Sequence, residues 1–121
     1  MNADALIAKI KRHPRYGEVG MILCHNGVVR ATSRDGRRVN GLRVAVDHRK
    51  LEAAVADGKT MPGVVEILVE IAEDRDLAVG EDVMLLVVAG DIRENVLAAL
   101  EKTLNTIKTA VTRKTEFFAE P

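Results

Sequence analysis

Apolar residues recur along the chain with two different periods, and the period indicates which secondary structure each segment adopts. Over residues 3–12 the apolar side chains are spaced three and four apart, which is typical of an amphipathic helix. Either Asn2 or Asp4 can cap the first turn. Proline disfavours a helical conformation in the residue before it, so the helix should end ahead of Pro14.

Two β-prone runs follow, over 19–24 and 28–32, separated by Asn26-Gly27. Asn-Gly between apolar runs is typical of a two-residue hairpin turn. The same dipeptide is equally compatible with a bulge inside one longer strand. Both alternatives remain open from the sequence.

A turn at 33–36 precedes a predicted strand near 39–46. Asp47 is placed to cap a short helix over 48–57, and Gly58 fits the C-terminal stop of that helix.

The second half contains two further strand candidates and a long helix. Over 64–72 apolar residues partly alternate with glutamates, which favours a strand, with a helix as the alternative. The uninterrupted apolar run 83–89 indicates a strand buried on both faces. Asp91 and Glu94 resemble a capping box at the start of a helix expected over 92–111. The order of elements predicts the α+β class, with an antiparallel or mixed sheet and helices packed on it.

Composition narrows the domain count and the class of partner. With 121 residues, 47% of them hydrophobic, the chain should form one domain over 1–121 with a short tail at 115–121. Its 18 Lys and Arg balance 18 Asp and Glu, and it has only three aromatic residues, so neither a nucleic-acid partner nor base stacking is indicated. No apolar stretch is long enough to cross a membrane.

Cys24 is the only cysteine, which excludes an internal disulfide. The N-terminal residues do not have the pattern of a secretion signal, and we therefore expect a cytoplasmic protein. The three histidines lack metal-ligand spacing, so no metal site is predicted, and His25 is interpreted as an ordinary side chain. The charges are nevertheless uneven, because basic residues dominate 30–50 and acidic residues dominate 66–82.

Several local strings, together with the order of elements, resemble one known family over about residues 4–116. The strings are Gly27-Val28-Val29-Arg30, Ser33-Arg34-Asp35-Gly36-Arg37-Arg38-Val39, Leu77-Ala78-Val79-Gly80-Glu81 and Lys114-Thr115-Glu116. They are similar to the large subunit of molybdopterin synthase, the MoaE family. The resemblance implies an α/β hammerhead fold.

The resemblance also implies an activity. Members of that family transfer sulfur to cyclic pyranopterin monophosphate from a thiocarboxylate on a small ubiquitin-like protein ending in Gly-Gly. They are typically homodimers and need no metal or separate cofactor in this subunit. A chain of this kind would be a sulfurtransferase whose reactants are both anions, so positive side chains are the ones expected in its site.

The candidate site residues are accordingly basic. Lys108 matches the lysine regarded as catalytic in the family, and Lys114 matches a second lysine beyond the last helix. Periodicity alone favours a different interpretation, in which both are solvated residues near a helix C-terminus. The candidates for binding the anionic groups of the reactants are Arg30, Arg93, Arg37 and Arg38.

The sequence departs from the family pattern at several places, two of them at positions where the family has histidine or arginine. Ala72-Glu73 stands where the family has His-Arg, and Ile92 stands where it has a histidine. These departures keep an alternative open: a catalytically impaired homodimeric module that binds a ubiquitin-like partner or a pterin and regulates the pathway.

Overall fold

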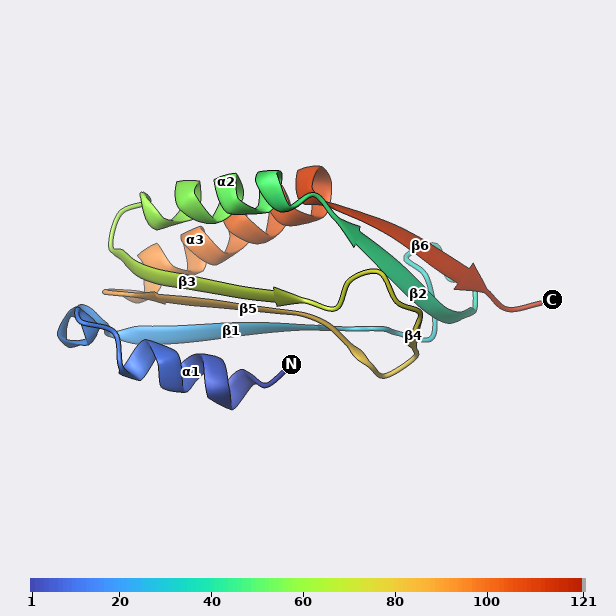
Figure 1. Cartoon of the computed structure of the whole chain (residues 1–121), viewed down its shortest axis with the longest axis horizontal. Coiled ribbons are helices and arrows are strands. Elements are labelled where there is room, and N and C mark those ends of the chain that lie inside the picture. The colour runs from blue at the N-terminus through green and yellow to red at the C-terminus, as the bar shows by residue number, and fades with distance from the viewer. Residues whose placement is uncertain (121) are drawn as a thin grey trace.

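The structure is a computed structural model that describes residues 1–120, and it has an elongated shape built from two small sheets and three α-helices (Figure 1). The elements in chain order are α1 (Ala3–Lys11), η1 (Tyr16–Glu18), β1 (Met21–Val28), β2 (Val39–Val46), α2 (His48–Lys59), β3 (Val64–Ile71), β4 (Leu77–Ala78), β5 (Asp82–Gly90), α3 (Arg93–Thr106), the π-helical turn η2 (Ile107–Val111) and β6 (Thr112–Phe118). The predicted α+β class is confirmed.

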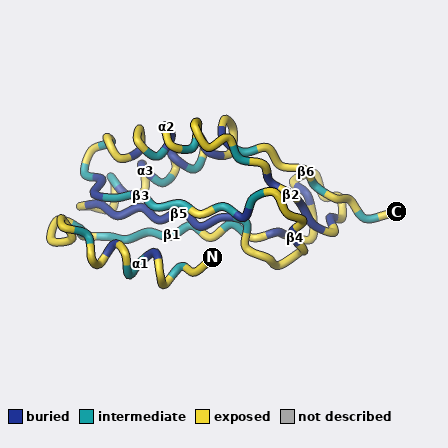
Figure 2. The backbone as a smooth tube through the Cα atoms, in the orientation of Figure 1, coloured by how far each residue is buried: buried dark blue, intermediate teal, exposed yellow. Residues whose placement is uncertain are grey.

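The first sheet has the strand order β1-β5-β3, with both pairs antiparallel. Helices α2 and α3 cover one of its faces and α1 covers the other (Figure 1). The central strand β5 is therefore buried on both sides, as its unbroken apolar run predicted, and it is dark blue along most of its length in Figure 2. The ambiguous segment 64–72 forms the edge strand β3 rather than a helix.

The second sheet has the order β4-β2-β6, also antiparallel, and projects from the end of the first sheet towards the C-terminus (Figure 1). A small apolar cluster joins the two sheets. It consists of Val29, Leu42, Val44, Ala72 and Leu77. Residues 115–118 of the predicted tail are the end of β6 and so belong to this sheet; residue 121 lies outside the described residues.

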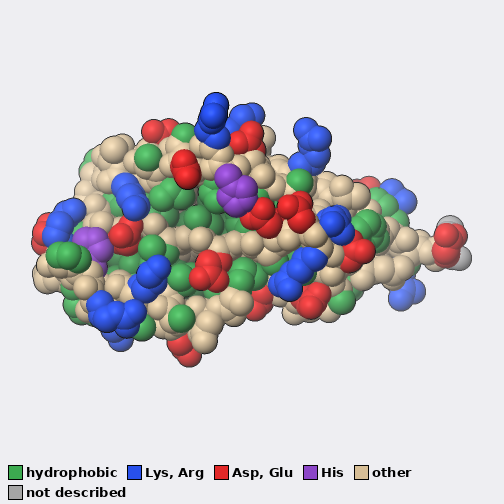
Figure 3. Space-filling view, viewed as in Figure 1, with side chains coloured by type: hydrophobic (Ala, Val, Ile, Leu, Met, Phe, Trp, Pro, Cys, Tyr) green, Lys and Arg blue, Asp and Glu red, His purple; other side chains and the backbone are tan. Residues whose placement is uncertain are grey.

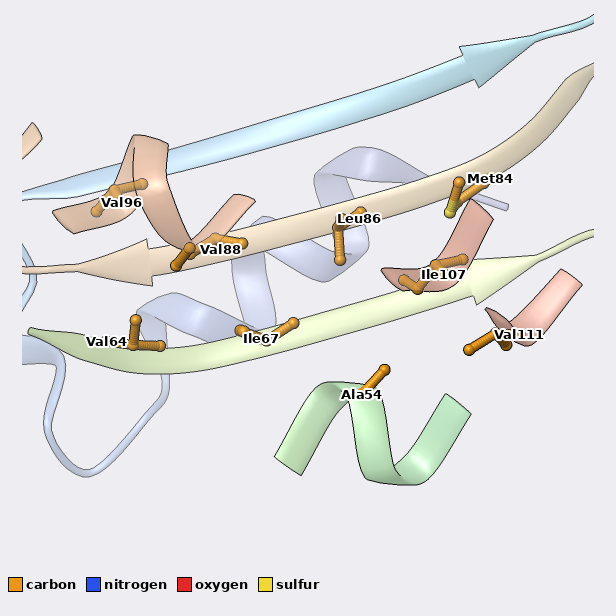
Figure 4. Packing of buried hydrophobic residues seen from close by; sticks show 10 residues of the cluster. Ala54, Val64, Ile67, Met84, Leu86, Val88, Val96, Ile107 and Val111 are labelled. Atoms are coloured by element: carbon orange, nitrogen blue, oxygen red, sulfur yellow. The ribbon is translucent and has the colours of Figure 1, made fainter. Parts of the chain in front are cut away.

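The main core lies between the first sheet and the helix pair. Figure 4 shows Leu86 and Val88 of β5 facing Val96 and Ile107, while Ala54 of α2 joins the same cluster beside β3. The core is aliphatic, as the low aromatic content required. Alternate residues of β1 complete it, since Met21 and Leu23 pack against the same cluster.

The structure decides the two questions that the sequence left open in the N-terminal half, namely the cap of the first helix and the conformation at Asn26-Gly27. Asn2 caps α1 by accepting a hydrogen bond from the Ala5 backbone N–H. Asn26-Gly27 does not form a hairpin, because β1 continues through it and shifts register between Gly27 and Val28. The bulge interpretation is therefore correct, and residues 28–32 are not a separate strand.

Two predicted helix ends are wrong. Gly58 does not stop α2, which continues to Lys59; it is instead buried where α2 meets Ile67 and Thr103. The capping box at the start of α3 does not form either, because Ile92 is the N-cap residue and makes no side-chain cap.

The carboxylate of Asp91 instead accepts from the Ile92 backbone N–H and from the Asn95 side-chain amide. Helix 92–111 is correct in extent, but its last five residues form the π-helical turn η2.

Candidate functional site

A cavity of about 360 Å³ lies where the two sheets meet, at the size typical of small-molecule sites. Residues from both sheets, from η2 and from the loop after β1 line it. The polar or charged members of the lining are His25, Arg34, Lys108, Thr112 and Lys114, and the others are Gly27, Val28, Leu42, Val44, Ile71, Val83 and Met84. Every ionisable side chain among these is basic, so the cavity suits an anion.

Lys108 reaches the cavity from the π-helical turn η2. The wider turn is fixed by Thr112, whose backbone N–H and hydroxyl both bond to the carbonyl of Ile107, with the hydroxyl oxygen at 3.2 Å. Such turns are frequent at functional sites. Ile107 and Val111 on either side are buried in the main core, so the backbone that carries Lys108 is anchored while its side chain is exposed.

Lys114 reaches the same cavity from β6. It pairs with Val44 of β2, another lining residue, and side chains of paired residues lie on the same face of a sheet. Its Nζ is 4.0 Å from a carboxylate oxygen of Glu116, two positions further along the same face. The structure thus brings together the two lysines that the family resemblance had singled out.

The loop after β1 contributes a different arginine from those expected. Arg34 lines the cavity, whereas Arg37 and Arg38 do not. Arg37 stacks on Phe118 at the far end of β6, with Cζ 3.6 Å from the ring centroid, and Arg38 forms a backbone bridge with Thr32. Only the loop conformation distinguishes these three neighbouring arginines, so the sequence could not separate them.

Arg30 and Arg93 also lie outside the cavity of this chain. Arg30 is exposed just beyond β1. Arg93 begins α3 and Lys108 follows its other end, and a helix of 14 residues separates them by about 20 Å. The Arg93 side chain is 76% exposed, with its Nε 3.8 Å from Glu94.

His25 was interpreted as an ordinary side chain, yet it lines the cavity. Its Nε2 is buried, and no described residue hydrogen-bonds to it. Burial lowers the pKa of His25, and the positive charge of Lys108 lowers it further, so both favour the neutral imidazole. The alternation along β1 could have revealed it, since His25 is on the same face as Met21 and Leu23.

Near the cavity, the basic and acidic stretches partly neutralise each other. Arg43 bonds to the Asp76 carboxylate at 3.0 Å and to the Asp74 carbonyl at 2.7 Å. His48 Nε2 is 2.7 Å from a carboxylate oxygen of Glu73, and this contact raises the pKa of His48. Positive and negative side chains are accordingly interspersed on the face shown in Figure 3.

The described residues contain no cluster of three or more His, Cys, Asp or Glu side chains able to hold a metal ion. Within residues 1–120, no helix combines the length and apolarity that a membrane span requires.

Comparisons with known proteins agree with the fold and cover nearly the whole chain. The profile of the family described as MoaE protein matches residues 1–110. No curated protein sequence matches the chain.

Solved structures resemble it at low sequence identity. Molybdopterin synthase from Staphylococcus aureus is 19% identical with a TM-score of 0.72, covering 86% of this chain and 78% of that one. Molybdopterin cofactor biosynthesis protein E from Burkholderia multivorans is 19% identical with a TM-score of 0.76, covering 98% and 81%. A complex of subunits 1 and 2 of molybdopterin-converting factor from Helicobacter pylori is 19% identical with a TM-score of 0.70, covering 99% and 85%.

Proposed function

Because the chain belongs to the MoaE protein family, which serves molybdenum cofactor biosynthesis, we propose that it is the large-subunit component of a molybdopterin synthase. It transfers sulfur to cyclic pyranopterin monophosphate from the thiocarboxylate of a small ubiquitin-like protein ending in Gly-Gly. The observation that carries the proposal is the cavity at the sheet junction, which holds Lys108 and Lys114 and is lined by no carboxylate among the described residues.

The charges of the cavity match the requirements of this reaction. The phosphate and the thiocarboxylate repel each other, by roughly 4 kcal/mol for two unit charges about 4 Å apart at an effective dielectric constant of about 20. Three cationic side chains offset that repulsion, namely Lys108, Lys114 and Arg34. Lys108 is the principal catalytic group of the proposal, since an ammonium can neutralise developing charge and donate a proton. Lys114 binds the reacting groups beside it.

The proposal extends to assembly. The subunit complex from Helicobacter pylori supports a small partner subunit for this chain as well. A homodimer is supported by exposed apolar side chains on the first turns of α3, where Ile92 is 53% and Leu97 47% exposed. Light scattering on the purified protein tests the dimer, and a monomeric mass at micromolar concentration contradicts it. Arg30, Arg37, Arg38 and Arg93 stay predicted anion-binding residues of the assembled enzyme.

The decisive experiment compares two lysine variants. Lys108→Ala should lower dithiolene formation by at least about a hundredfold when the thiocarboxylated partner and the pterin substrate are supplied. Lys102→Ala is the matched control, because Lys102 is an exposed lysine of α3 outside this cavity, and its rate should stay within about twofold of wild type. Full activity of the Lys108 variant contradicts the proposal.

A second candidate function is the catalytically impaired binding module. It is favoured by Ala72 and Glu73, because Ala72 is buried in the cluster between the sheets and Glu73 is engaged by His48. Neither supplies a cation. Turnover and partner binding measured on one preparation separate the two functions: tight partner binding without turnover identifies the module, and robust turnover excludes it.

A further inference from the structure

His25 lines the cavity together with Lys108, Lys114 and Arg34, and burial and the charge of Lys108 lower its pKa. It ends a row of alternating β1 side chains whose other members, Met21 and Leu23, pack into the apolar core. Its Nε2 is buried and has no hydrogen-bond partner among residues 1–120, while the imidazole borders the cavity. An unsatisfied buried polar atom costs about 1–3 kcal/mol, so the position calls for an explanation beyond packing.

The elements around the imidazole account for its charge state. Lys108 on η2, Lys114 on β6 and Arg34 in the loop after β1 are the charged groups that share the cavity with it. The lining residues of β2, β3 and β5 are all apolar, and Glu116, near Lys114, lies outside the lining. A fourth positive charge is therefore disfavoured while the cavity is empty.

A bound anion reverses this balance. An opposite charge within about 4–6 Å favours the protonated form of an imidazole by roughly 1–3 pKa units. We propose that His25 is a ligand-binding residue of this cavity, which takes up a proton from solvent when an oxyanion of the phosphate-monoester class binds and then serves as a hydrogen-bond donor to it. The N–H bond forms as the O–H bond of a hydronium ion or buffer acid in the solvent breaks, and no other covalent bond changes. The inference deepens the proposed function, since it rests on the same cavity.

The direct test is a nuclear magnetic resonance titration of the wild-type protein. Sulfate is the probe, because it carries an oxyanion charge and does not itself titrate between pH 5 and 9. The pKa of His25 should rise by about one unit or more with saturating sulfate. His48 is the internal control, because it is exposed and already paired with Glu73, and its pKa should stay constant.

A variant series makes the same test through affinity. Sulfate affinity of the wild type should increase as the pH falls from 8 to 6, by at most about tenfold per pH unit for one linked proton. His25→Gln retains hydrogen-bonding atoms but cannot be protonated near neutral pH, so its affinity should be nearly independent of pH. His48→Gln should retain the wild-type dependence.

The outcomes separate the two proposals. If sulfate shifts resonances of Lys108 and Thr112 while the pKa of His25 stays constant, the role of His25 is refuted and the proposed function stands. If sulfate does not bind in the cavity at all, the role of His25 is refuted as well. The proposed function then depends on the Lys108→Ala rates alone, and it fails only if that variant retains full sulfur transfer.

Discussion

Replacing Gly58 by alanine tests the packing that positions the helix pair over the first sheet. A methyl group added at Gly58 would lie 2.6 Å from Ile67 Cδ1 and 2.6 Å from Thr103 Oγ1. Both neighbours are buried, at 1% and 2% exposure, so neither side chain has room to move away.

Two effects of this substitution oppose each other. Alanine is a better helix former than glycine, by up to about 1 kcal/mol inside a helix and less near its end. Overpacking of a closely packed core costs about 1–3 kcal/mol. Overpacking should dominate, because the added methyl group would overlap two side chains and because the gain in helix propensity is small in the last turn of α2. We therefore expect a net loss of about 1–2 kcal/mol in the free energy of unfolding.

Urea unfolding followed by circular dichroism measures this difference. Ala56→Gly is the matched control, because Ala56 is exposed on the same helix and reports the propensity effect alone, a loss of up to about 1 kcal/mol. If Gly58→Ala is as stable as the wild type or more so, the close approach of α2 to β3 and α3 is refuted.

Two further predictions concern stability near the helices and the sheet junction. Burial alone would raise the pKa of Glu66, but the hydrogen bond and charge of Lys59 lower it overall, so its contribution to stability is present above its unfolded pKa near 4.5 and is lost as the pH falls through the folded value. Glu66→Gln should therefore be less stable than the wild type at pH 6 in urea unfolding, and this difference in the free energy of unfolding should shrink as the pH falls to 3. A difference that stays constant across this pH range would contradict the contribution of Glu66. Asp74 has a φ of 57°, a left-handed conformation that glycine adopts without strain. Asp74→Gly should therefore raise the free energy of unfolding by up to about 1 kcal/mol, measured by thermal unfolding. A lower melting temperature of the variant would argue against backbone strain at Asp74.

The sequence predicted the elements whose patterns are strong and local. The run 83–89 could be assigned to a strand buried on both faces. An apolar stretch of that length, with no polar residue to face solvent, is stable in an α+β domain mainly at the centre of a covered sheet. The short strand β4 was missed, because two residues carry no periodicity and their pairing with Gly41 and Leu42 exists only in the folded chain.

The two errors at helix ends have different physical causes. Asp91 makes local contacts, because its carboxylate accepts from the Ile92 N–H and from Asn95 rather than capping the helix as expected. The role of Gly58 is decided by distant neighbours, because α3 and β3 approach its backbone. Local propensity cannot anticipate contacts made across the core.

The same limit applies to the site. Lys108 and Lys114 were found only through the family resemblance, since periodicity alone favoured solvated residues near a helix end. Arg34 required the loop conformation. His25 was within reach of sequence reasoning, because residue parity on β1 places it beside Met21 and Leu23 on the face that α3 covers.

The two lysines of the cavity are carried by different parts of the molecule. Lys108 is held by a turn packed into the main core, whereas Lys114 belongs to the projecting sheet of β2, β4 and β6. Any flexing of this projecting arm against the body of the protein changes the separation of the two amines. A pair of spectroscopic labels, one on each part, would therefore report any change in the width of the cavity as a single distance.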